Sequence, residues 1–232
     1  DADLLAMLTV GPAPVVDDTQ SEGTLNWNFN SGSEAFNSLA AGETLVLSYT
    51  VTVTDDAGSP LSDSETITVT ITGSNDAPAV TGGSTTGVVT ETNATITASG
   101  TFVIEDVDTT DTVTAAVVGV AASGNTSGLA PSAAALKAML SVQTGEVVTS
   151  SSSTGSATWN FNSGTEAFDY LAAGETLTLT YTVRLTDSAT PSGTRDQAVT
   201  IQIGGSNDSP LILGGKQTVA LAETDAGLTA SG

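Results

Sequence analysis

Residues 176–185 read Thr-Leu-Thr-Leu-Thr-Tyr-Thr-Val-Arg-Leu, and every second side chain is apolar. Residues 44–53, Thr-Leu-Val-Leu-Ser-Tyr-Thr-Val-Thr-Val, follow the same pattern apart from Val46. A period of two over this length predicts a strand with one face in a core and the other in solvent, which is typical of antiparallel sheets. These two segments therefore predict an all-β fold.

The two segments lie 132 positions apart, because the chain repeats itself at that interval. Trp-Asn-Phe-Asn-Ser-Gly stands at residues 27–32 and again at 159–164, and Gly-Ser-Asn-Asp at 73–76 and again at 205–208. No insertion or deletion is needed between the copies. A gapless repeat of this length is typical of a tandem array of domains, since 132 residues can enclose a core of their own.

The repeat divides the chain into three parts. We expect residues 1–75 to be the C-terminal part of one repeat, 76–207 a complete repeat and 208–232 the first strands of the next, so that the sequence is a fragment of a longer repetitive protein. About seven short strands separated by turn residues predict a β-sandwich in each complete repeat. The junction at residues 75–78, Asn-Asp-Ala-Pro, is short, and its proline favours a stiff connection.

Two segments depart from the strand pattern. In residues 133–140, Leu136 and Leu140 recur at helical spacing, and Ser132 is suited to cap the helix start. We expect one such short helix per repeat, closing one end of the sandwich. Residues 166–171 are expected to form a single helical turn that crosses between the sheets.

Charge and composition exclude several classes of partner. The chain has 26 acidic and four basic residues, giving a net charge of −22, which repels nucleic acid and anionic membranes. The same charge attracts cations. There is no cysteine, so neither a disulfide framework nor a thiolate metal site is expected. No apolar run approaches the roughly 20 residues of a membrane span.

The sequence offers no catalytic constellation. It contains neither histidine nor cysteine, which removes the commonest general base and the thiol nucleophile. No nucleophile-elbow, P-loop or dinucleotide-binding motif is present. We therefore expect a protein that is not an enzyme.

The acidic residues gather at the two ends of the expected sandwich. If strands run up and down in sequence, the loops after the second and sixth strands lie at the end where the chain enters the repeat, the entry pole. Asp106, Asp108 and Asp111 follow the second strand, and Asp187 follows the sixth. The opposite end, the exit pole, is expected to carry Glu91, Glu175, Asn207 and Asp208.

Stacking two repeats brings one exit pole against the next entry pole, and we call this junction the seam. It is expected to join seven oxygen-bearing side chains: Glu43, Asn75, Asp76, Asp106, Asp108, Asp111 and Asp187. Calcium takes six to eight oxygen ligands, whereas magnesium demands a strict octahedron and keeps its waters. Carboxylates held this close repel one another without a counter-ion. The seam therefore predicts a Ca²⁺ site, with a solvated loop or an Asx turn as the alternative for either group alone.

At these residues the chain resembles the VCBS-type repeats of large bacterial surface adhesins of the RTX class. The resemblance lies in residues 100–108, 159–161, 171–177 and 200–208, and it covers nearly the whole period. Residues 122–156, which contain the expected helix, are longer than the usual family pattern. The sandwich is therefore expected to be decorated in that stretch.

The resemblance implies an Ig-like or cadherin-like fold, export by a type I system and a place on the bacterial cell surface. It also implies a role as a calcium-dependent stalk in adhesion or biofilm formation. The parts that are similar to a cadherin junction are its edge glutamates, its Asn-Asp connector and its Asp-x-Asp motif, at Glu91 and Glu175, Asn75-Asp76, and Asp106 and Asp108. The full cadherin connector carries further acidic and amide residues that this sequence lacks.

Two other classes of function stay open. A ligand- or carbohydrate-binding adhesive module usually exposes aromatic or arginine anchors, whereas aromatic residues make up 4% of this chain. We expect all of them except Tyr170 in the core, Trp159 and Phe161 included. A subunit of a surface lattice or filament would associate laterally in calcium. The stalk interpretation predicts only neighbouring repeats of the same chain as partners, with no nucleic acid and no membrane insertion.

Overall fold

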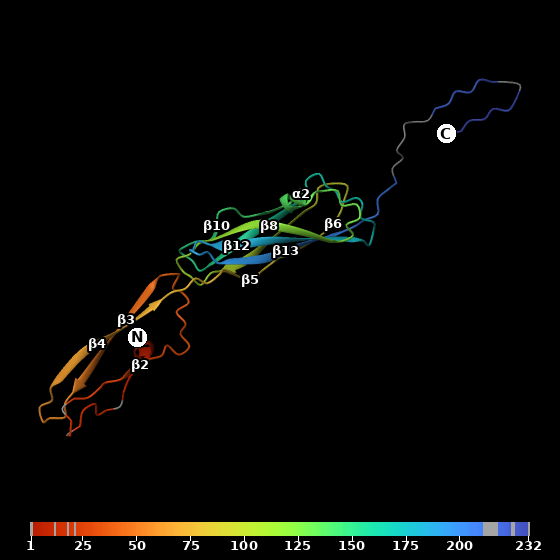
Figure 1. Ribbon diagram of the computed structural model, residues 1–232. Helices are drawn as coiled ribbons and strands as arrows, with labels where there is room; N and C mark the ends of the chain where they lie inside the picture. The colour runs from red at the N-terminus through yellow and green to blue at the C-terminus, as the bar shows by residue number, and fades with distance from the viewer. Residues whose placement is uncertain are drawn as a thin grey trace.

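The computed structural model describes residues 2–11, 13–17, 19–20, 22–210, 218–223 and 226–231. Two units follow one another along the chain, a first unit within residues 2–75 and a complete repeat within residues 76–207 (Figure 1). The strands expected in residues 208–232 fall partly outside the described residues, and the described ones from 208 onward form no strand. The three domain boundaries stay predictions.

The complete repeat is a sandwich of two sheets (Figure 1). One sheet has the strand order β10-β8-β12-β13-β6 and the other β5-β7-β11-β9. The strands are β5 Ala79–Gly83, β6 Thr86–Thr90, β7 Thr97–Glu105, β8 Val113–Gly124, β9 Leu140–Val142, β10 Glu146–Val148, β11 Thr154–Asn162, β12 Thr176–Asp187 and β13 Thr194–Gly204. The all-β prediction is confirmed. The repeat has nine strands instead of about seven, because β9 and β10 come from the long stretch of residues 122–156.

The core explains the alternation in β12. This strand pairs antiparallel with β13 on one side and β8 on the other. Its apolar side chains, from Leu177 to Leu185, are fully buried against Trp159 and Phe161 of the opposite sheet. The predicted core position of both aromatic residues is confirmed. Burial of this apolar surface, at about 25 cal/mol per Å², is the main term that holds the two sheets together.

One strand pair departs from the antiparallel pattern. β6 pairs parallel with β13, because the first strand of the repeat crosses from one sheet to the other between β5 and β6. The crossing begins at Gly83, whose φ is +99°. A Cβ at this position would lie 2.4 Å from the carbonyl oxygen of Thr101, so only glycine fits.

The predicted helix is present but shorter than expected. α2 spans Ala133–Ala138, and the Ser132 hydroxyl accepts a hydrogen bond from the amide of Ala135 at 3.3 Å, as its capping role requires. The helix ends before Leu140, because that residue begins β9 and pairs with Phe161 in the sheet. Pairing with the sheet therefore overrides the helical spacing.

The helical turn predicted for residues 166–171 is wrong. The segment consists of turns and irregular backbone, and Phe168 has a φ of +63° while its side chain is fully buried. The Glu166 carboxylate accepts a hydrogen bond from the amide of Phe168 at 3.1 Å. Burial of the Phe168 ring thus holds this segment in a loop conformation, which the sequence pattern did not indicate.

The first unit repeats the second half of the complete repeat. It contains α1 Ala2–Ala6, β1 Leu8–Val10, β2 Trp27–Phe29, β3 Thr44–Thr54 and β4 Ser62–Thr72, with β1 paired to β2 and β3 to β4. The register is the same in both units, as Leu45 pairs with Ile71 and Leu177 with Ile203. No described strand of the first unit corresponds to β5–β8. Among the described residues of the whole chain, neither helix is long and apolar enough to cross a membrane.

Candidate metal centre

The strand register places the predicted acidic loops at one pole. β7 ends at Glu105, which pairs with the first residue of β5, and β12 ends at Asp187, which pairs with the first residue of β8. The loop that follows β7, the loop that follows β12 and the connector that precedes β5 therefore meet at the entry pole. The sequence-based assignment of these loops to one pole is confirmed.

Direct hydrogen bonds tie the connector to this pole. The Asn75 side chain donates to the Asp187 carboxylate at 3.1 Å, and the Asp76 amide donates to the Asp108 carboxylate at 2.8 Å. A further bond joins the two units, because the Thr109 hydroxyl donates to the carbonyl oxygen of Ser38 in the first unit at 3.3 Å. The seam is thus built from both sides.

The four aspartates of the entry pole are buried, with exposed fractions of 1% for Asp106 and Asp108, 8% for Asp111 and 6% for Asp187. Local hydrogen bonds hold them in place. The Asp106 carboxylate accepts from the amide of Asp108 at 3.1 Å, and both Asp187 oxygens accept from the amide of Gly193 at 2.9 Å. The Asp111 carboxylate accepts instead from the Ser188 hydroxyl at 3.4 Å, so each of the four carboxylates is held by at least one hydrogen bond.

Several oxygens in this pole have no hydrogen-bond partner. The buried side-chain oxygen and nitrogen atoms without a partner, among the described residues, are Asn75 Oδ1, Asp106 Oδ2, Asp108 Oδ1, Asp111 Oδ2 and Glu91 Oε2. All are acceptors when the acids are ionised, and four of the five lie at the seam. A buried polar group left unpaired costs about 1–3 kcal/mol, and more when it is charged. A cation is the partner that such a set of acceptors fits.

The electrostatics of the seam favour the same partner. Burial, helped by the charges of Asp108, Asp187 and Asp111, raises the pKa of Asp106 to about 6, although the hydrogen bond from the amide of Asp108 lowers it. Burial also raises the pKa of Asp108, with contributions from Asp76 and Asp111. No basic side chain relieves this repulsion, since the one ion pair among the described residues joins Arg184 to Asp196 on an exposed sheet face.

Glu43 of the first unit acts on the seam through the electrostatic effect of its negative charge. It contributes to the raised pKa of Asp111, behind burial and the charge of Asp187. Its carboxylate also accepts a hydrogen bond from the amide of Ala40 at 3.0 Å, which closes its own loop. Six of the seven predicted seam residues thus lie together at this junction, and Glu43 acts on Asp111 through its charge.

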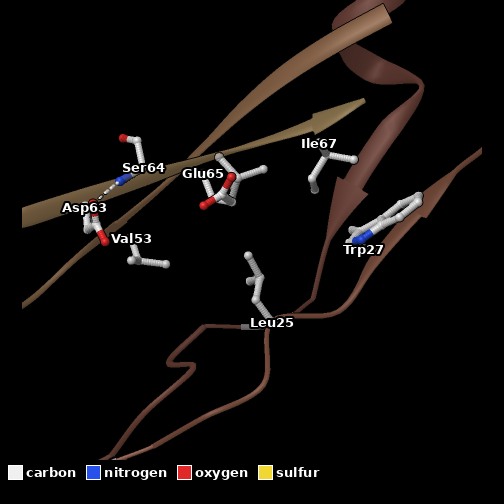
Figure 2. A pocket seen from close by; sticks show the side chains of 8 residues that line it. Leu25, Trp27, Val53, Asp63, Ser64, Glu65 and Ile67 are labelled. Atoms are coloured by element: carbon white, nitrogen blue, oxygen red, sulfur yellow. Dashed lines mark hydrogen bonds between the residues drawn. The ribbon is translucent and has the colours of Figure 1, made fainter. Parts of the chain in front are cut away.

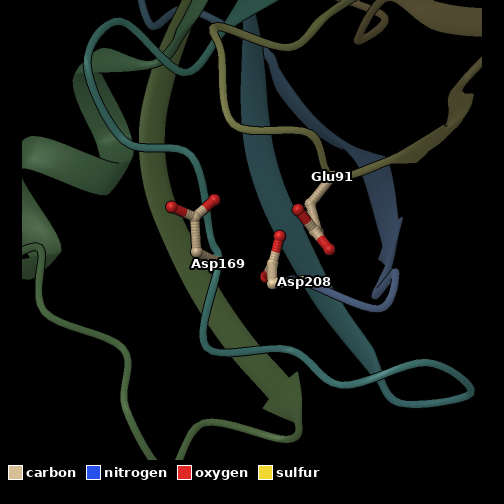
Figure 3. A group of neighbouring side chains, drawn as sticks. All are labelled: Glu91, Asp169 and Asp208. Carbon is tan, nitrogen blue, oxygen red and sulfur yellow. The ribbon is translucent and has the colours of Figure 1, made fainter. Parts of the chain in front are cut away.

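The exit pole is also formed as predicted. β6, β12 and β13 meet there, because Gly204 pairs with both Thr90 and Thr176. Glu91 is 1% exposed, and its Oε1 accepts a hydrogen bond from the amide of Ser206 at 2.6 Å. Figure 3 shows Asp208 beside it, and one carboxylate oxygen from each of Glu91, Asp169 and Asp208 lies within 4.8 Å of the other two.

The other two residues predicted for the exit pole lie outside that group of carboxylates. The Glu175 carboxylate accepts a hydrogen bond from the amide of Ala172 at 2.9 Å and so closes its loop, as Glu43 does in the first unit. The Asn207 side chain donates to the carbonyl oxygen of Asp208 at 3.5 Å. Their predicted role as metal ligands stays a prediction.

Asp169 is the residue that sequence reasoning missed. It lies in the segment 166–171, which was expected to be helical and was given no role at the pole. Its counterpart 132 positions earlier is Asn37, so the repeat does not show an acid at both positions. The one sequence feature that could have indicated its role is the position of Asp169 in the loop between β11 and β12, which leads to the exit pole.

A hollow in the first unit has a different meaning. Figure 2 shows Leu25, Trp27, Val53 and Ile67 lining it, together with polar residues of β4. Their counterparts 132 positions later are fully buried in the core of the complete repeat: Ala157, Trp159, Leu185 and Val199. The hollow is therefore the core-facing side of the first unit, and it is no evidence for a sugar site.

Comparison with known proteins finds structural similarity without a sequence match. No protein-family model and no curated protein sequence matches this chain. Extracellular cadherin domains 1–5 of protocadherin gamma B2 match 88% of the chain at 15% identity, with a TM-score of 0.43, and the chain spans 34% of that structure. A protocadherin gammaB7 EC3-6 structure matches 86% at 16% identity and a TM-score of 0.42, over 40% of its own length. AggA, the major subunit of aggregative adherence fimbriae type I from Escherichia coli, matches 56% at 12% identity and a TM-score of 0.34, over 97% of its length. The fold assignment rests on the chain's own strand pairing.

Proposed function

We propose that this chain is a calcium-stabilised extender, a stalk segment of a bacterial cell-surface adhesin that projects a distal binding domain for attachment or biofilm formation. The observation that carries the proposal is the set of four unpaired buried oxygens at the seam, on Asn75, Asp106, Asp108 and Asp111. They come from the connector and from the repeat that follows it. An ion held there would join successive repeats.

The donor set fits calcium. Asn75, Asp76, Asp106, Asp108, Asp111 and Asp187 are the residues that would hold the ion. They offer carboxylate and amide oxygens in the number that Ca²⁺ takes. The bound ion would supply positive charge and accept the lone pairs of the unpaired oxygens.

The chain's own contacts then explain rigidity. The bonds from Asn75 to Asp187 and from Asp76 to Asp108 already hold the connector against the repeat. Repulsion among the buried aspartates opposes that arrangement, and neutralising it leaves the connector fixed. An ion that binds only the ordered state adds about 2.7 kcal/mol of stability at a hundredfold excess over its dissociation constant. Low calcium inside a cell and high calcium outside would keep the chain soft before export and stiff afterwards.

The test is thermal unfolding of the 232-residue chain in calcium and in chelator. We expect calcium to raise the midpoint, and we expect Asp108→Asn to remove most of that increase. Glu146→Gln serves as the control, because it removes one charge from an exposed position in β10. A midpoint that does not respond to calcium would contradict the proposal.

A distance measurement tests the rigidity itself. The chain has no cysteine, so spin labels can be attached at Ala57→Cys in the first unit and Thr144→Cys in the complete repeat. We expect a narrow distance distribution in calcium and a broad one in chelator. Equal widths in both conditions would show that the seam does not set the angle between the units.

A further inference from the structure

We propose that this chain associates head to tail with a second copy of itself by strand exchange. Residues 218–222 of one copy, the donor segment, pair with the open edge of β4 in the next copy, as β6 pairs with β13 inside the complete repeat. The contact needs no metal, so it goes beyond the proposed function and is independent of the seam.

The receiving site is the edge of β4 that lies away from β3, where no described strand is paired. In the complete repeat, β6 covers the equivalent edge of β13, and the Thr200 amide donates to the carbonyl oxygen of Thr85 at 2.8 Å. The amide at the position of Thr200 is that of Thr68, so the amides of alternate residues 68, 70 and 72 point to the open edge of β4. An open edge of this kind is a template for another strand.

The donor segment, Thr-Val-Ala-Leu-Ala, is the counterpart of β6 but is not part of a strand. Val219 is 67% exposed and Leu221 is 48% exposed. The β6 residue at the position of Leu221 is Val89, which packs against the core. In the exchange Leu221 lies opposite Ile71 of β4, on the core-facing side of the first unit. The donor segment thus carries exposed apolar side chains at the spacing that β6 uses for burial.

The two segments are also complementary in size. In the complete repeat Gly87 stands opposite Ile201, and a Cβ on Gly87 would lie 3.0 Å from Cδ1 of Ile201 and 2.9 Å from the Cβ of Ala98. The corresponding pair in the exchange is Val219 and Val69, and valine has no Cδ1. Ala98 belongs to β7, which has no described counterpart in the first unit. The larger residue of the donor segment therefore meets the smaller residue of β4.

Charge and chain geometry point to a second copy as the partner. The chain has a net charge of −22, yet residues 218–222 and residues 68–72 contain no charged side chain, so the two segments do not repel each other. The complete repeat stands between the first unit and the C-terminal segment of the same copy (Figure 1). A contact between two different surfaces does not close on itself, so it continues from copy to copy.

Sedimentation velocity of the 232-residue chain over a concentration series, in chelator, tests the proposal. We expect species larger than the monomer that increase with concentration. Leu221→Asp is expected to weaken self-association about tenfold or more, because it places a charge against an apolar face. Ala220→Asp is the matched control for charge, because its β6 counterpart, Val88, is 71% exposed, and it is expected to associate like the natural sequence.

A second pair of variants tests the receiving edge. Thr70→Pro removes an amide that points to the open edge, and proline is tolerated on an edge strand at such a position. Thr70→Ala keeps this amide. We expect Thr70→Pro to lose the larger species and Thr70→Ala to keep them, with the same circular dichroism spectrum for both. A labelled peptide of residues 208–232 is expected to bind the natural chain in fluorescence anisotropy and to bind Thr70→Pro about tenfold or more weakly.

Three results would overturn the proposal. The first is a monomer at every concentration, and the second is equal association of Leu221→Asp and Ala220→Asp. The third is a set of larger species that persists in Leu221→Asp, since self-association would then use another surface. Leu221 lies outside every strand, so this variant stays informative even if Thr70→Pro does not fold. All of these measurements are made in chelator, so none depends on calcium at the seam.

Discussion

The first unit and residues 133–207 of the complete repeat share strands, register and much of their sequence, yet they differ in burial. Trp27 is 50% exposed and Trp159 is fully buried, and Val53 is 45% exposed where Leu185 is fully buried. The difference comes from β5–β8, which have no described counterpart in the first unit. The alternation of apolar and polar side chains thus determines where strands form. The apolar side chains are buried only where other strands, here β5–β8, pack against them.

The largest expected effect on stability comes from substituting the two equivalent tryptophans, Trp159 and Trp27. Trp159→Ala removes a fully buried ring and the hydrogen bond from its indole to the carbonyl oxygen of Ser84 at 2.8 Å. We expect it to lower the free energy of unfolding by about 3–5 kcal/mol. Trp27→Ala is expected to cost less than about 1 kcal/mol, because half of that side chain is exposed. Denaturant unfolding followed by circular dichroism measures both, and equal losses would contradict the assigned core.

A second prediction uses pH to examine the seam in chelator. The pKa of Asp106 is raised from 3.8 to about 6 in the folded chain. The folded state therefore takes up a proton before the unfolded state does, and stability rises as pH falls from 7 towards 4. We expect the midpoint to rise by several degrees, since 1 kcal/mol corresponds to about 2–8 °C for domains of this size.

The controls for this prediction reverse or remove the effect. In excess calcium, protons compete with the ion, so acidification is expected to lower the midpoint. In Asp106→Asn the rise in chelator is expected to shrink, because the group that takes up the proton is gone. A rise of the same size in this variant would assign the effect to the overall net charge of −22 instead.

A smaller effect compares two equivalent tyrosines. The Tyr181 hydroxyl donates to the carbonyl oxygen of Leu136 at 2.9 Å, and that of Tyr49 donates to the carbonyl oxygen of Leu4 at 3.0 Å. Tyr181→Phe is expected to cost about 1 kcal/mol, because the bond is buried. Tyr49→Phe is expected to cost less, since water can reach the half-buried Leu4. Thermal unfolding of both variants gives the order, and a larger cost for Tyr49→Phe would contradict it.

The smallest effect concerns the start of α2. Ser132→Ala removes the acceptor for the amide of Ala135 and is expected to cost about 0.5–1 kcal/mol. Ser132→Asp keeps an acceptor and is expected to stay near the natural stability. Denaturant midpoints of the two variants measure the difference, and equal values would show that the cap contributes nothing.

The sequence predicted those parts of the structure that depend on local pattern. The strands β3 and β12, the cap at Ser132 and the poles of the acidic loops all follow from alternation, residue type and chain order. It could not predict that β9 and β10 form in residues 122–156, because these short strands depend on pairing with β8 and β11. Asp169 was missed for a related reason. The burial of Phe168 sets its loop, and burial is a property of the assembled core.

The parallel pair of β6 and β13 has a mechanical consequence. The chain enters the repeat through β5, ahead of β6, and leaves it after β13, so a force that pulls the two ends of the repeat apart would pull β6 and β13 in opposite directions. The pull acts along the strands, and all five register pairs from Thr86 to Thr90 resist it together instead of parting one at a time. This strand pair is therefore loaded in shear, which is the geometry that the proposed stalk function would require.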